Sequence, residues 1–122
     1  MDKWQAIDTF WNLFNIPAYD ESSVPDDASF PYITYQVSTD SLGNPQFMTA
    51  SIWYHGTTWE HVSNKADEIA HAIVTMPRPL ELDVGYLWIV KGTPFAQRMS
   101  DPDDPLIRRV VLNIQAEYLT AD

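Results

Sequence analysis

Cysteine is absent from this sequence of 122 residues, which excludes disulfides, thiolate-bound metals, iron–sulfur clusters and cysteine nucleophiles. Glycine occurs only four times, and no two glycines have the spacing of a phosphate-binding loop. Basic residues are also scarce. Seven Lys and Arg stand against 17 Asp and Glu, so the net charge is −10. Because this charge would repel a phosphate backbone, we do not expect sequence-specific binding of DNA or RNA.

Long apolar runs are missing as well. No stretch approaches the roughly 18 consecutive apolar residues of a membrane-spanning helix, and Met1–Gln5 does not have the basic-then-apolar pattern of a signal peptide. We therefore expect a cytosolic protein with no membrane partner. The composition is 45% apolar and 13% aromatic, which is typical of globular proteins. The length predicts one domain over residues 1–122.

Two segments have the period of amphipathic helices. Near the N-terminus, apolar side chains recur at helical spacing, and we expect Asp2 near the start of this helix and Pro17 beyond its end. Its predicted apolar stripe is Trp4, Ile7, Trp11 and Phe14, widened by Phe10 and Leu13.

The second helix is predicted to begin with a capping box at Thr57 and Glu60 and to end at Pro77 and Pro79. Its apolar stripe is the strongest periodic signal in the sequence. The stripe consists of Trp59, Val62, Ala66, Ile69, Ile73 and Met76.

Four segments are predicted to be strands, and two others contain proline and acidic residues without any period, as loops do. The strands are residues 30–38, 46–55, 86–91 and 106–119, and the loops are residues 15–29 and 92–105. The first two strands form an antiparallel hairpin, while residues 86–91 are almost continuously apolar, as in a central strand covered on both faces. The element order α-β-β-α-β-β predicts an α+β fold, with a four-stranded, mostly antiparallel sheet and two helices packed on one face.

Few residues suggest chemistry. Glu68 and His71 have the spacing of a carboxylate-bridged metal site, but such sites need two such pairs and the sequence has one. Asp101, Asp103 and Asp104 suggest a weak surface cation site, although a polar loop tip is the favoured interpretation. There is no nucleophile elbow. We therefore predict no catalytic residue, no cofactor and no bound metal.

Aromatic residues on the outward side of the predicted sheet are the more informative feature. If alternate residues such as Ile33 and Ile52 face the helices, then neighbouring aromatic side chains lie on the opposite face. One interpretation is that the helices or the long loop cover that face instead. The other is a contact between subunits, where exposed apolar anchors contribute most of the binding energy. The residues predicted to form this contact are Tyr32, Phe47, Trp53, Phe95, Met99 and Val111.

Several stretches resemble the tail-terminator, or tail-completion, proteins of long-tailed bacteriophages. They are residues 30–35, 51–54, the Gly-Thr-Thr helix start at 56–58, residues 66–69 and the closing strand at 109–118. The resemblance implies a virion structural protein of the tail or neck, assembled in the host cytoplasm. It also implies a homo-oligomeric ring, a hexamer, that caps the tail tube and joins it to the head. Its partners would be tail-tube and head-completion or connector proteins, and DNA would pass through without specific binding.

Two other classes of function remain open from the sequence. A small acidic binding module or inhibitor would present carboxylates to a basic partner. A small hydrolase or metal enzyme would need side chains that meet only in the folded chain.

Overall fold

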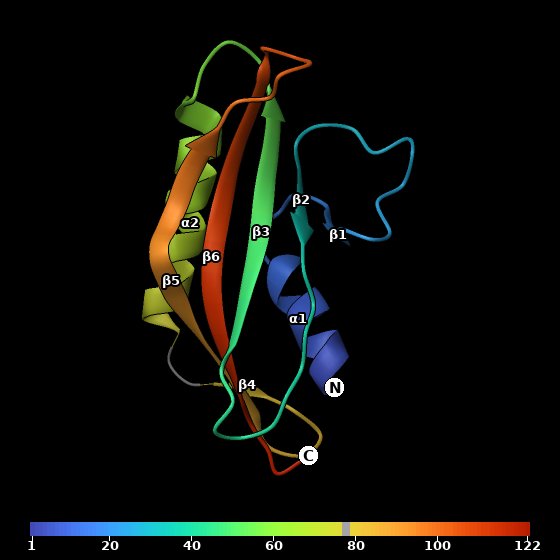
Figure 1. Ribbon diagram of the computed structural model, residues 1–122, viewed down its shortest axis with the longest axis vertical. Coiled ribbons are helices and arrows are strands. Elements are labelled where there is room, and N and C mark those ends of the chain that lie inside the picture. Colours follow the sequence, from blue (N-terminus) through green and yellow to red (C-terminus); the bar gives the residue numbers. More distant parts are fainter. Residues whose placement is uncertain (77–78) are drawn as a thin grey trace.

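The computed structural model describes residues 1–76 and 79–122, which form an α+β fold (Figure 1). The helices are α1 (Lys3–Trp11) and α2 (Glu60–Thr75). The strands are β1 (Ala18–Asp20), β2 (Tyr32–Tyr35), β3 (Gln46–His55), β4 (Leu80–Glu81), β5 (Tyr86–Met99) and β6 (Ile107–Leu119). They form one sheet in the order β1-β2-β3-β6-β5-β4. Side chains of both helices and of one sheet face join in a single apolar core, so both helices pack on the same face, as predicted.

The sheet has six strands rather than the predicted four. The loop predicted at residues 15–29 contains β1, which pairs in parallel with β2, and β4 pairs with the start of β5. These strands have three and two residues, too few to show a period of two. The strand predicted at residues 30–38 is shorter, from Tyr32 to Tyr35, while the antiparallel hairpin of β2 and β3 is confirmed.

The prediction of a loop at residues 92–105 is wrong for the first half of that segment. Residues 92–99 continue β5, which pairs with β6 on both sides of a bulge between Lys91 and Ala96. Gly92 and Pro94 fall inside that bulge, where a missing N–H or an irregular backbone is tolerated. The connection that remains, residues 100–106, is short. β6 is confirmed at Ile107–Leu119, and it is the strand with long partners on both sides.

Helix α1 begins as the sequence predicts and ends earlier. The Asp2 carboxylate accepts the Gln5 backbone N–H at 2.8 Å, and the Gln5 side chain accepts the Asp2 N–H at 3.0 Å, which makes a capping box. The helix ends at Trp11, well before Pro17. Trp4 and Leu13, predicted to be in the buried stripe, are 56% and 57% exposed. Leu13 follows the end of the helix and therefore leaves the stripe.

Helix α2 confirms its predicted stripe, since four members are buried and the two end members pack against the core. The capping box predicted at Thr57 and Glu60 is wrong. The helix starts at Glu60, and the Glu60 N–H is accepted by the Thr58 hydroxyl at 3.1 Å. The N-cap is Trp59, two residues later than predicted, so Thr57 lies outside the first turn. Pro77, predicted to end the helix, lies outside the described residues, and the helix ends at Thr75.

Candidate subunit interface

The outer face, meaning the sheet face turned away from α1 and α2, carries one aligned row of large side chains. Tyr32 lies opposite Trp53, Trp53 lies opposite Arg109, and Arg109 lies opposite Met99. The row therefore runs across β2, β3, β6 and β5. Three of its members are predicted interface residues, and folding brings them together although they are far apart in the sequence.

Stacking holds the centre of this row in place. The Tyr32 and Trp53 rings stack with centroids 6.2 Å apart, and the Arg109 guanidinium lies 4.6 Å from the Trp53 ring centroid. The Trp53 indole N–H donates to the Thr34 hydroxyl at 2.9 Å. Burial among these groups raises the pKa of Tyr32. Because the side chains already support one another, a partner would bind them with little loss of conformational freedom.

A second apolar group lies on the same face near the opposite end of the strands. Phe47 lies opposite Gln115, which lies opposite Val90, and Trp88 lies opposite Glu117. Phe47 is the most exposed large apolar residue described, at 75%. No layer of the described structure covers this group. Exposed large apolar side chains gathered on one sheet face are typical of a binding surface.

Tyr86 and Trp88 are outer-face residues that sequence reasoning missed. They are 49% and 42% exposed, so the prediction of a central strand covered on both faces is wrong. Among the described residues, β5 has only the two residues of β4 beyond it. The sequence carries a signal for this arrangement. Leu87 and Ile89, which are buried, alternate with the two exposed aromatic residues, as in a strand with one covered face.

The structure places the other predicted interface residues separately. Val111 lies on the outer face one row away from Arg109, opposite Ser51 and Gln97. Phe95 lies in the β5 bulge and packs against the core, with the Lys91 ammonium 5.9 Å from its ring centroid. Phe95 therefore belongs to the core margin rather than to the exposed row.

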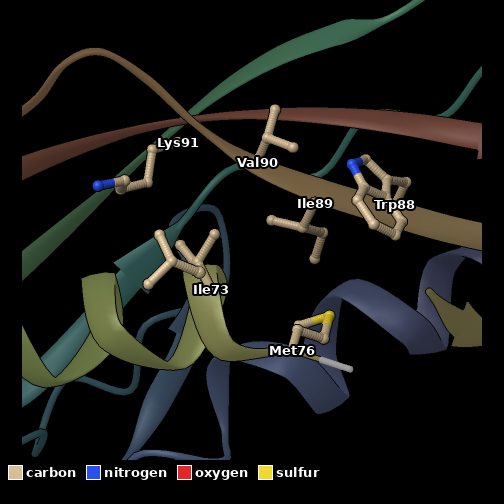
Figure 2. Close-up of a pocket in the computed structure, with 7 residues that line it drawn as sticks. Ile73, Met76, Trp88, Ile89, Val90 and Lys91 are labelled. Atoms are coloured by element: carbon tan, nitrogen blue, oxygen red, sulfur yellow. The ribbon is translucent and has the colours of Figure 1, made fainter. Parts of the chain in front are cut away.

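A pocket lies beside the outer edge of β5, between that strand and the end of α2 (Figure 2). Its volume is about 380 Å³, and Figure 2 shows Ile73 of α2 and Met76, the residue after the helix, across from Ile89, with Lys91 further along the strand. The lining is mainly apolar and holds one cation, Lys91. The pocket is therefore suited to packing against apolar groups.

The carboxylates in residues 100–106 hold their own loop together. Asp101 accepts the backbone N–H groups of Asp103 and Asp104 at 2.9 and 3.0 Å. Asp104 accepts the Leu106 N–H and lies 3.0 Å from His55 Nε2, and the Leu106 hydrogen bond lowers the Asp104 pKa. Within residues 1–76 and 79–122, no three His, Asp or Glu side chains are grouped so that they could hold a metal ion. The side chains of Asp101 and Asp104 thus accept backbone N–H groups of their own loop.

Comparison with known proteins adds no relative: no protein-family model matches the chain, and a search of curated proteins found no match. Among the described residues, no helix is both long and apolar enough to span a bilayer.

Proposed function

We propose that this protein is a structural component of a long-tailed bacteriophage, a tail terminator or a closely related neck protein. It forms a hexameric ring that caps the tail tube and joins it to the head. It contacts tail-tube and head-completion proteins, and DNA passes through the ring without specific binding. The proposal rests on the resemblance of the hairpin, second helix and closing strand to this family, together with the uncovered outer face.

The observation that carries the proposal is the exposed apolar surface of the outer face. Phe47, Tyr86 and Trp88 contribute rings that the monomer leaves in water. Burying one such side chain fully is worth about 1.5–3 kcal/mol. Identical copies arranged in a ring can cover this surface, because a heterologous contact joins two different patches of each subunit.

The experiment replaces Phe47 with Glu. Because Phe47 is 75% exposed, we expect the free energy of unfolding to change by less than about 0.5 kcal/mol. We expect assembly to weaken by about tenfold or more, because the charge would have to be buried in the contact. Light scattering coupled to gel filtration gives the mass, and thermal melting confirms folding.

Leu13→Glu is the matched control, since Leu13 is an exposed apolar residue at the end of α1. This variant should assemble as the unaltered protein does. If Phe47→Glu assembles equally well, the outer face is not the contact. A protein that stays monomeric and never caps purified tail tubes in electron micrographs would contradict the proposal and favour the small acidic binding module.

A further inference from the structure

We propose that the two edges of the sheet bind each other head to tail between neighbouring copies. The acidic edge (Asp20, Glu21, Asp26 and Asp27) of one copy lies along the basic edge (Lys91 and Arg98 of β5) of the next. This inference rests on the proposed ring, and it adds a contact between sheet edges to the contact made by the outer face.

The acidic edge follows β1, the outermost strand on one side of the sheet. Figure 1 shows the segment after β1 looping away from the body of the molecule. Asp20 accepts the Ser22 N–H at 2.9 Å and its hydroxyl at 2.7 Å, and these bonds keep the Asp20 pKa below its ordinary value. Glu21, Asp26 and Asp27 are exposed. In the described part of the chain, none of the four carboxylates forms an ion pair.

The basic edge lies on the opposite side of the sheet. β4 pairs only with Tyr86 and Leu87, so the rest of β5 has a free edge among the described strands. The exposed cations of Lys91 and Arg98 lie 5.9 Å and 5.0 Å from the ring centroids of Phe95 and Trp59. Neither cation forms an ion pair within residues 1–76 and 79–122. Asp67 of α2 lines the same hollow as Arg98 beyond ion-pair distance.

Opposite charges on the two edges select the kind of contact that copies can make. If two basic edges met, Lys91 and Arg98 would face their own counterparts, and two acidic edges would repel in the same way. A basic edge against an acidic edge is attractive, and it repeats from copy to copy as a ring requires. The acidic edge also carries Val24 and Pro25 between its carboxylates. The apolar pocket beside Lys91 offers these two residues a surface to pack on.

The test reverses each edge separately. We expect Lys91→Glu/Arg98→Glu and Glu21→Lys/Asp26→Lys/Asp27→Lys, which turn the charges of the two edges to −2 and +2, to remain folded and to be monomeric when each is alone. An equimolar mixture should recover the mass of the unaltered assembly, because each variant's reversed edge meets the complementary edge of the other. The control is Glu81→Lys/Asp122→Lys, which reverses two charges at the other end of the sheet. This variant should assemble normally. Melting curves confirm that every variant is folded.

Each other outcome is decisive. Reversed variants that keep the normal mass would overturn the edge contact and leave the ring proposal standing. Charge-dependent filaments in electron micrographs would support the edge contact and contradict the ring. If all mixtures are monomeric, Asp27→Cys and Arg98→Cys proteins are mixed and oxidised, since the chain has no other cysteine. A disulfide between the two variants, with none within either alone, supports the contact, and its absence overturns the inference.

Discussion

Gly85 connects β4 to β5 and is the most closely surrounded of the four glycines. Its φ of +93° lies in a region that L side chains rarely adopt, and a Cβ there would overlap the backbone of Leu119. The Gly85 carbonyl also accepts the Leu82 N–H at 3.0 Å. This close approach lets the end of β6 pass beside the turn.

Replacing Gly85 with Ala should therefore lower the free energy of unfolding by about 3 kcal/mol or more, combining backbone strain with overpacking. Gly43→Ala is the matched control, because Gly43 has a similar φ of +91° and open space around it. We expect it to cost about 1–2 kcal/mol. Urea unfolding of both variants checks the difference, and equal losses would show that the Leu119 backbone can move aside.

The position of Trp53 in the sequence predicts which sheet face the residue lies on, but not which residues it contacts. Alternation along residues 46–55 correctly places Trp53 on the face opposite Ile52. Its partners come from elsewhere: Tyr32 and Thr34 from β2, and Arg109 from β6. These contacts depend on strand register, which a single strand's pattern does not contain.

Helix α2 is held by its apolar stripe rather than by its ends. Trp59 at the N-cap makes no capping hydrogen bond with its side chain, whereas Val62, Ala66, Ile69 and Ile73 are buried against the sheet. Most of the stability of such a helix comes from packing of its apolar face.

We expect Ile69→Ala to lower the free energy of unfolding by about 2–4 kcal/mol, because Ile69 is fully buried and its loss leaves a cavity. Val74→Ala on the same helix should change it by less than about 0.5 kcal/mol, since Val74 is 61% exposed. Chemical denaturation followed by circular dichroism measures both. A small effect at Ile69 would mean that the core beneath α2 closes around the missing atoms.

The elements that the sequence predicts well are those whose pattern is long and local. The α2 stripe and the alternation of β3 and β6 each extend over ten or more residues. β1, β4 and the second half of β5 exist because a neighbouring strand offers hydrogen bonds. Proline and glycine in residues 92–95 correctly indicate an interruption of β5. They do not indicate that the strand resumes at Ala96.

The charge of the molecule is unevenly placed, and this bears on its behaviour toward DNA. A net charge of −10 opposes adsorption of a phosphate backbone. Lys91 and Arg98 would be covered by the acidic edge of the next copy in the proposed ring. An assembled ring would then present mainly negative charge.

We therefore expect no retardation of double-stranded DNA in a gel-shift assay, even at about 50 mM salt, where electrostatic binding is strongest. The assay should use the protein at assembling concentrations, with a basic DNA-binding protein as positive control. Retardation that disappears in Lys91→Glu/Arg98→Glu would show that the basic edge is open to DNA and would contradict free passage.

β6 lies between β3 and β5 and is the last strand of the chain. During translation, the β2–β3 hairpin and β5 emerge first, and neither can pair with the other until residues 107–119 leave the ribosome. The six-stranded sheet is thus completed only after β6 has been made. A chain cut short before β6 would keep the β1–β2–β3 and β4–β5 pairings but would lack the strand that joins them, so the outer-face row from Tyr32 to Met99 could not form.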